Sequence, residues 1–305
     1  MKNQTLFHAG LLILTALIWG VAFVAQSEGG DAVGPYTFNC IRSLIGAAVL
    51  TPVIRARAHR GKSAPPASPA QRRQLLRGGV LCGVALCVAS NLQQLGINLG
   101  TSAGKAGFLT ACYLLLVPIL GLPLKKHCAW NTWIGVGITL IGLYLLCING
   151  GFRLQFSDLL LLLCALVFAI QILAVDYFAP LVDGVRLSRI QLLVTGVLTA
   201  IPMLAIDLPS QGAAAWCAAL LSWDAWIPIL YAGVMSCGVA YTLQIIGQQG
   251  VSPTVASLLM SLESVFSVLA GWVLLHQALS ARELAGCALI FAAVIFAQLP
   301  LGKRP

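Results

Sequence analysis

The feature that most constrains this 305-residue chain is a segment that occurs twice, 150 residues apart. Residues 100–109 align without a gap on residues 250–259, and the register continues upstream through a neighbouring apolar run. Shared apolar composition inflates such matches, so the polar and small residues matter most. The most informative identities are Gly83/Gly233, Cys87/Cys237, Gln94/Gln244, Gly100/Gly250 and Ser102/Ser252. The chain is therefore predicted to contain two copies of one unit, residues 1–150 and 151–305.

The second copy contains an acid where acids are rare. Ser252–Leu275 is an apolar run of membrane-spanning length, and its only carboxylate is Glu263. Ser252 and Pro253 are typical of a helix N-cap and first turn. Counted from Ser252, Glu263 lies roughly 16 Å along the helix, about halfway through a ~30 Å hydrocarbon layer. An acid at that depth is a functional-site hypothesis, and the register makes Tyr113 its counterpart in the first copy.

Composition indicates a membrane protein, because 59% of the residues are hydrophobic and only 9% are charged. A soluble chain of this length exposes far more charge. The ten cysteines are scattered, with no C-x-x-C pair and no Cys/His cluster in the sequence, so they are expected to be small packing residues. No metal or other cofactor is predicted.

Ten apolar segments have the length of a membrane span: residues 6–25, 36–54, 75–97, 102–122, 129–148, 157–177, 187–207, 226–247, 253–275 and 283–300. The first is too long, and preceded by too little basic charge, for a cleaved signal peptide, so we expect it to be retained. The predicted fold class is an all-α polytopic membrane protein with ten transmembrane helices.

The basic residues between these spans fall mostly on one side. With the N-terminus in the cytoplasm, 14 of the 18 Lys and Arg residues lie in cytoplasmic segments, as the positive-inside rule predicts. Residues 56–74 then form a polar, proline-rich cytoplasmic linker, and both termini are cytoplasmic. The outer side holds Glu28, Asp31, Asp207 and Asp224. This distribution explains the formal charge of +9 without a nucleic-acid partner.

Five spans per copy is an odd number, and that determines how the copies relate. Homologous halves with odd span counts sit upside down relative to each other, an arrangement typical of secondary transporters. The fourth span starts outside and the ninth starts inside, and each reaches mid-membrane after about 11 residues. Tyr113 and Glu263 are therefore expected to lie close together near a pseudo-twofold axis in the membrane plane.

This pattern resembles the EamA-type transporters of the drug/metabolite transporter superfamily across nearly the whole chain. The resemblance implies ten helices in two inverted five-helix repeats, and export or exchange of small metabolites across the bacterial inner membrane. The residues that carry it are Leu17-Ile18-Trp19-Gly20, Arg42, Ser102–Thr110, Val117-Pro118, Leu258–Phe266 and Gly286. The chain departs from the family pattern at Ser264, where a proline is usual, and at His276-Gln277, where Gly-Glu often ends the span.

Two cations lie within or at the edge of predicted spans. Arg42 could snorkel outward, bond to backbone carbonyls or contact the substrate. Lys105 lies in the first turn after the candidate cap Ser102, where the helix dipole disfavours a cation, so it could bind an anionic substrate group or snorkel to the outer interface. Glu263 could pair with either cation, pair with a cationic substrate group, carry a proton, or be a neutral structural acid.

Further polar side chains complete the predicted substrate-binding and translocation site. Asn91 and Gln94 lie on the third span, and Tyr241 and Gln244 lie on the eighth. Some are expected to line a cavity and others to join helices. Trp19 is a candidate for the cavity or for the aromatic belt at the membrane surface. Spans 1, 3, 4, 6, 8 and 9 are expected to enclose the cavity.

The sequence favours a secondary transporter that moves a small metabolite, such as an amino acid or related compound, by alternating access. Expected partners are the substrate, the lipid bilayer and, as a candidate coupling ion, the proton; the oligomeric state is left open. An intramembrane enzyme is the competing class, but the sequence lacks an H-E-x-x-H motif, paired intramembrane aspartates and a serine–base pair, so no catalytic residue is predicted. A membrane scaffold without transport activity is the third class.

The charge distribution makes a testable prediction about topology. Cysteine-accessibility labelling should place both termini, the 56–74 linker and Lys125-Lys126 in the cytoplasm, because basic segments resist translocation. The same labelling should place Asp31 and Asp224 outside. A C-terminus labelled from the outside would contradict both the ten-span count and the inversion.

Overall fold

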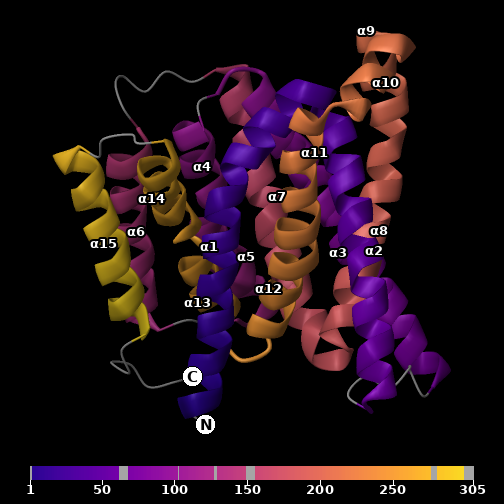
Figure 1. Ribbon diagram of the computed structural model, residues 1–305. Helices are drawn as coiled ribbons and strands as arrows, with labels where there is room; N and C mark the ends of the chain where they lie inside the picture. The colour runs from indigo at the N-terminus through magenta and orange to yellow at the C-terminus, as the bar shows by residue number, and fades with distance from the viewer. Residues whose placement is uncertain are drawn as a thin grey trace.

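The computed structural model describes residues 2–61, 68–101, 103–126, 129–148, 155–275 and 280–298, and throughout these ranges the secondary structure is helical, without strands (Figure 1). The first half contains α1 (Lys2–Val33), α2 (Pro35–His59), α3 (Pro69–Asn98), α4 (Ala103–Ala111), α5 (Tyr113–Gly121), η1 (Leu122–Leu124) and α6 (Trp130–Cys147). The second half contains α7 (Phe156–Phe178), η2 (Ala179–Leu181), α8 (Gly184–Pro202), η3 (Met203–Asp207), α9 (Leu208–Gln211), α10 (Ala213–Leu221), α11 (Trp223–Leu230), η4 (Tyr231–Ala240), α12 (Tyr241–Gly247), α13 (Pro253–Met260), α14 (Glu263–Leu275) and α15 (Ala281–Gln298).

Nine of the predicted spans correspond to helices that are long and apolar enough to cross a membrane, counted over the described residues. The predicted tenth span, 283–300, corresponds to α15, which reaches Gln298 at the edge of the described range. In Figure 1, α1 begins and α15 ends at the same end of the bundle. That placement is what an even number of crossings produces.

Several spans differ internally from the continuous helices that the sequence suggests. The fourth span is divided into α4 and α5, and the ninth into α13 and α14. The seventh and eighth spans contain π-helical segments, η3 and η4. A short helix that the sequence analysis missed, α10, follows the seventh span. In Figure 1, α4 lies above α5 whereas α14 lies above α13, so the two divided spans run in opposite directions.

The breaks have a local cause in the backbone hydrogen bonds. The Ser261 hydroxyl donates to the Leu258 carbonyl at 2.7 Å, so it competes for a helical acceptor. The backbone N–H of Leu262 then donates to Leu259 at 3.3 Å, three residues back instead of four. In the fourth span, the N–H of Cys112 makes the same three-residue bond to Leu109 at 3.3 Å. Each break immediately precedes one of the two residues that the register pairs, since α5 begins at Tyr113 and α14 at Glu263.

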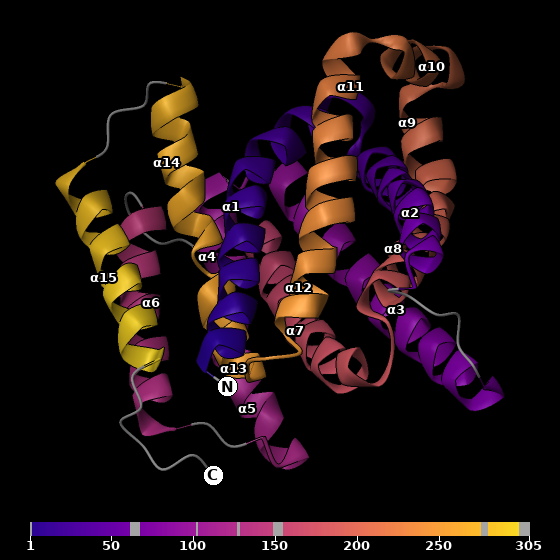
Figure 2. The same cartoon turned by 60° about the horizontal axis from the view of Figure 1, so that its bottom comes forward.

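Glycines set how closely the helices pack. Helices α6 and α15 lie side by side in Figures 1 and 2, and a β-carbon on Gly142 would lie 2.9 Å from the Gly286 carbonyl oxygen. Helix α3 approaches α8 at Gly83, where a β-carbon would lie 2.7 Å from the Val194 β-carbon. Such contacts between small residues are how helices associate when lipid removes the hydrophobic driving force.

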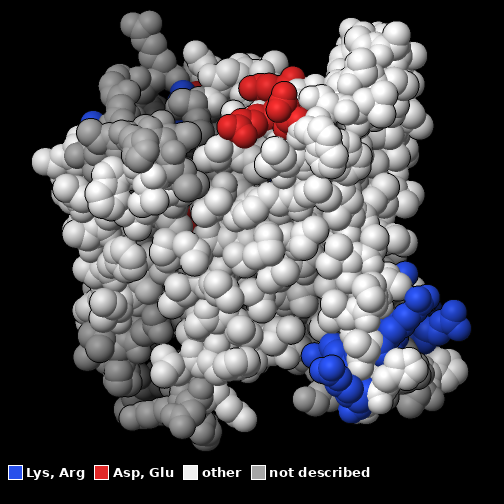
Figure 3. Space-filling view, in the orientation of Figure 1, with Lys and Arg blue, Asp and Glu red and all other residues white. Residues whose placement is uncertain are grey.

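The charged surface is divided between the two ends of the bundle. Figure 3 shows the largest group of Lys and Arg residues at the lower end and the main acidic group at the upper end. Exposed basic residues cluster where α2 ends and α3 begins, at Arg55, Arg60, Arg72, Arg73 and Arg77. The described ends of the chain lie at the same lower end as this basic group.

Gly20 lets α1 pack closely against the ninth span just after its break. A β-carbon there would lie 2.7 Å from the Glu263 carbonyl oxygen and 2.8 Å from the Ser267 backbone nitrogen. We expect Gly20→Ala to cost about 1–3 kcal/mol, because backbone atoms cannot yield as a flexible side chain can. Thermal unfolding of the purified protein in detergent measures the loss.

The matched control for this prediction is Gly10→Ala on the same helix. No atom lies within 4 Å of a β-carbon built on Gly10, so this change should be neutral or slightly stabilising. Equal melting temperatures for the two variants would show that the close approach at Gly20 does not contribute to the free energy of unfolding.

Candidate functional site

A narrow cavity of about 40 Å³ lies between helices of both halves. A volume of this size holds only a few water molecules. All six spans predicted to enclose it contribute side chains, and α2 adds one more. Six of the nine residues predicted for the site line the cavity: Trp19, Arg42, Tyr113, Tyr241, Gln244 and Glu263.

The structure brings Tyr113 and Glu263 together, as the repeat register predicts. The Tyr113 hydroxyl donates to Glu263 Oε1 at 3.4 Å, and both side chains are buried. This distance is long for a bond between a hydroxyl and a carboxylate. Glu263 has no ion-pair partner among the described residues. The acid is therefore held by one weak contact and is available to a stronger ligand.

Arg42 is the cationic side chain of the cavity. It is only 3% exposed, and its guanidinium lies over the Phe38 ring, 5.1 Å from the ring centre. Its Nε is buried without a hydrogen-bond partner, and none of the ion pairs between described residues includes it. Of the three roles that the sequence left open, snorkelling and carbonyl bonding do not fit this geometry. A buried, unpaired cation in a cavity calls for an anionic ligand or for water.

Aromatic side chains form part of the cavity wall. Trp19 and Tyr241 make an edge-to-face contact with ring centres 4.9 Å apart, and the Trp19 Nε1–H donates to the Ser236 carbonyl at 3.4 Å. Tyr241 lines the same cavity as Arg42 and Glu263. Ser236 lies in the π-helix η4, and π-helical segments occur frequently at functional sites. Trp19 is therefore a cavity residue and not part of a surface belt.

A chain of glutamines within the second half runs from the cavity to α8, and the sequence analysis found only one of its members. Gln244 donates to Gln171 at 3.2 Å, and Gln171 donates to Gln191 at 3.2 Å. All three side chains are buried, and the Gln244 Oε1 has no partner. Isolated amides in the apolar runs of the sixth and seventh spans were the available signal, because an amide in lipid needs a partner.

Comparison with known proteins identifies the family. The model of the EamA-like transporter family matches residues 6–148 and again residues 155–298. The chain belongs to the EamA-like transporter family. It is 26% identical over 289 residues to an uncharacterized transporter of Archaeoglobus fulgidus, an alignment that covers 94% of this chain and 84% of the relative. A solved crystal structure with 21% sequence identity has the same fold, with a TM-score of 0.77 over 98% of this chain and 97% of its own.

Two of the remaining predicted residues join helices of this EamA-like transporter outside the cavity lining. Asn91 accepts from the Asn39 amide and donates to the Thr199 hydroxyl, each at 3.0 Å. Gln94 donates to the Gln26 carbonyl at 2.8 Å and to Asn98 at 2.9 Å. The neighbouring Gln93 faces the cavity instead. One residue along a helix is a turn of about 100°, so the sequence could identify the polar segment more easily than its face.

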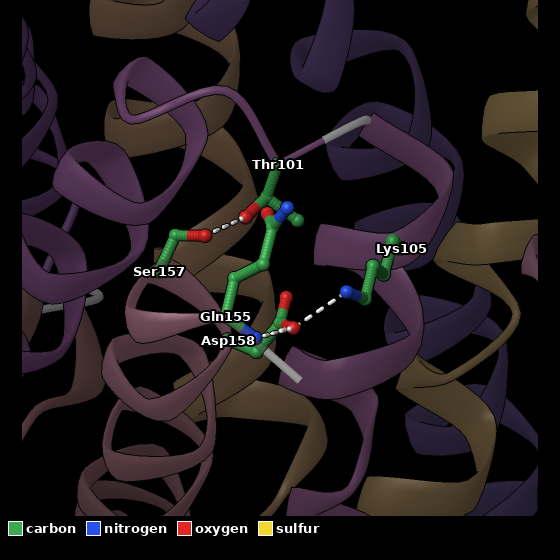
Figure 4. Close-up of polar contacts among 5 residues, drawn as sticks. All are labelled: Thr101, Lys105, Gln155, Ser157 and Asp158. Atoms are coloured by element: carbon green, nitrogen blue, oxygen red, sulfur yellow. Dashed lines mark hydrogen bonds and ion pairs between the residues drawn. The ribbon is translucent and has the colours of Figure 1, made fainter. Parts of the chain in front are cut away.

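Lys105 also lies outside the cavity lining, and it has an acidic partner that the sequence analysis did not identify. Figure 4 shows its ammonium group reaching from α4 to Asp158 in the first turn of α7, with Nζ and Oδ2 2.5 Å apart. Asp158 is fully buried and also accepts from the Gln155 N–H at 2.7 Å, which caps α7. Beside the pair, Thr101 donates to Ser157 at 2.7 Å. Lys105 therefore neutralises an acid of this transporter in the structure described.

A second ion pair joins the segment just after η1 to the last turns of α7. Lys126 Nζ lies 2.8 Å from Asp176 Oδ2, with the lysine side chain about half exposed and the aspartate largely buried. Two other sequence features fall outside the described residues: the candidate cap Ser102, and His276-Gln277, which replaces the usual Gly-Glu.

The buried ion pair leads to a prediction for stability. Lys105→Gln should destabilise this transporter by up to about 3–5 kcal/mol, because it leaves the Asp158 carboxylate buried without its cation. The matched change Lys126→Gln should cost about 0–1 kcal/mol, because the Lys126 side chain is 48% exposed. Thermal unfolding in detergent compares the two variants. Equal losses would contradict the difference in burial on which the prediction depends.

Proposed function

We propose that this protein is a secondary transporter of the cytoplasmic membrane that exports or exchanges a small zwitterionic metabolite, such as an amino acid, by alternating access. The observation that carries the proposal is the pair of opposite charges, Arg42 and Glu263, in one cavity. Neither is ion-paired with a described residue, and both are at least 95% buried. A substrate with one anionic and one cationic group satisfies both.

The energetics favour that substrate class over a singly charged one. A charged side chain inside a membrane costs about 2.5–3.5 kcal/mol on insertion scales, so both charges are disfavoured while the cavity holds only water. A carboxylate bound at Arg42 would form paired, charge-assisted hydrogen bonds. An ammonium at Glu263 would replace the long bond from Tyr113. The edge-to-face pair of Trp19 and Tyr241 would contact the apolar part of the substrate.

Alternating access between two inverted five-helix halves, residues 1–150 and 151–305, is part of the proposal. The family model matches once within each half, which supports it. Packing adds support, because Gly83 of α3 contacts Val194 of α8 while Gly233 of η4 contacts Ile45 of α2. The positions of these pairs agree with the repeat register to within one residue.

The size of the cavity fits one stage of such a cycle. A volume of about 40 Å³ is too small for an amino acid, so the described conformation must open before a substrate enters. The fourth span can bend at the break before Tyr113 and the ninth at the break before Glu263, because the backbone hydrogen bonds are already weakened there. Discontinuous helices at mid-membrane binding sites are frequent in secondary transporters.

The orientation that we propose places both termini and the basic 56–74 linker in the cytoplasm. Its support is the separation of the basic and acidic surface groups in Figure 3 together with the positive-inside rule. In this orientation α4 begins near the outer face and Arg77 lies near the inner face.

The test is counterflow into proteoliposomes loaded with a mixture of amino acids and the amines that lack their carboxylates. Wild-type protein should exchange at least one zwitterion and should reject the corresponding amine. Flux of no tested solute above empty liposomes would contradict the proposed substrate class. Flux of amine and amino acid at equal rates would contradict the role of Arg42.

Two conservative variants locate the binding groups. Glu263→Gln and Arg42→Gln keep some hydrogen-bonding capacity but remove one charge each, and the first also keeps the side chain's size, so each should lower flux at least tenfold. If protons are the coupling ion, Glu263→Gln should instead abolish the pH dependence of transport between about pH 5 and 8. The control is Glu28→Gln, the same change at an exposed acid, which should leave flux unchanged. Wild-type flux and pH profile in Glu263→Gln would show that the acid is structural.

A further inference from the structure

A second hollow lies on the outside of the bundle and shares no lining residue with the central cavity. It is a groove of about 700 Å³ between the first turns of α3 and the end of α7 with η2. Its apolar wall includes Val80, Leu81 and Phe178, and its polar rim consists of Gln74, Arg77 and Tyr177. None of its lining residues is acidic. This volume falls in the range of small-molecule binding pockets.

The groove exists because of how α3 crosses its neighbours. A β-carbon on Gly78 would lie 2.8 Å from the Phe178 ring, and one on Gly79 would lie 2.3 Å from the Ile190 side chain. The helices are therefore in closest contact at the two glycines. Side chains of α3 on both sides of this crossing, from Gln74 to Leu81, leave a wedge beside the end of α7. Van der Waals packing disfavours an empty apolar wedge, so the wedge will be filled.

The depth of the groove is that of the membrane surface. The predicted third span begins at residue 75 and the predicted sixth span ends at residue 177, so the groove lies where both reach the basic end of the bundle. Tyrosine is enriched at that level, and Tyr177 is 64% exposed. An arginine there can lay its methylene chain along apolar surface and hold its charge at the headgroups.

The charge of the rim is uncompensated. Arg77 is exposed and takes part in no ion pair between described residues, and Arg73 lies one helical turn away on the same face. The acid next to the groove in sequence, Asp176, is already paired with Lys126 at 2.8 Å. The rim thus offers a cation and two hydrogen-bonding side chains above an apolar wedge.

We propose that this groove binds an anionic phospholipid of the cytoplasmic leaflet. The phosphate group would lie at Arg77 with the Gln74 amide and the Tyr177 hydroxyl beside it, and an acyl chain would occupy the wedge against Val80 and Phe178. Basic pockets between transmembrane helices on the cytoplasmic side are suited to such headgroups. The proposal is independent of the substrate, because none of these residues lines the central cavity.

Native mass spectrometry of the purified protein tests the proposal, with phosphatidylglycerol and phosphatidylcholine of identical acyl chains added in equal amounts. Wild-type protein should retain phosphatidylglycerol preferentially. Arg77→Gln should reduce that preference about fivefold, the contribution expected of one arginine near the membrane surface. Val80→Trp, which fills the wedge, should reduce retention of both lipids.

The control is Arg60→Gln, which removes the same charge from the exposed end of α2, outside the groove. It should leave the preference unchanged. An equal loss in Arg60→Gln and Arg77→Gln would mean that net charge alone attracts the lipid, and would overturn the proposal. Unchanged preference in Arg77→Gln, or unchanged retention in Val80→Trp, would overturn it as well.

Discussion

A membrane interior supplies no water to charged groups, and the polar architecture of this protein depends on that constraint. Each buried charge must find a partner within the protein or receive one from outside. Asp158 has its partner in Lys105 and its own helix cap, so the structure satisfies it internally. Arg42 and Glu263 lack ion-pair partners among the described residues, and they face the same cavity. The contrast between satisfied and unsatisfied charges separates the scaffold from the candidate substrate site.

The same constraint explains which features could be predicted from the sequence. Hydropathy along the sequence predicts the helical fold class and the positions of the spans. The 150-residue register predicts that Tyr113 meets Glu263. The partner of Lys105 was not predictable in this way, because Asp158 lies 53 residues away on another span. Which of two adjacent glutamines faces the cavity was equally inaccessible, since Gln93 and Gln94 differ only in helix face.

The helix breaks could be predicted from the sequence only in part. The register pairs position 112 with position 262, and both divided spans are interrupted there. Yet nothing in the sequence around Cys112 resembles the serine-rich segment at Ser261 that competes for the Leu258 carbonyl. The proline that usually follows the acid in this family is absent, and Ser264 stands in its place. The ninth span is therefore broken without a proline, the residue from which a break could have been predicted. The Ser261 hydroxyl competes for a helical carbonyl there, and the backbone packs closely against Gly20.

The two Lys–Asp pairs have a consequence for how the bundle can deform. Lys105 lies in α4 and Lys126 just after η1, and both aspartates lie in α7, one in its first turn and the other near its end. The buried Lys105–Asp158 pair holds the two spans together strongly at one end, and the half-exposed Lys126–Asp176 pair holds them weakly at the other. Prising these spans apart at one membrane face would cost an ion pair there, whereas swinging the opposite wall, α1 with α12 and α14, would cost neither. The cavity is lined by side chains from both groups of helices, so a movement of α1, α12 and α14 would change its shape without breaking either ion pair.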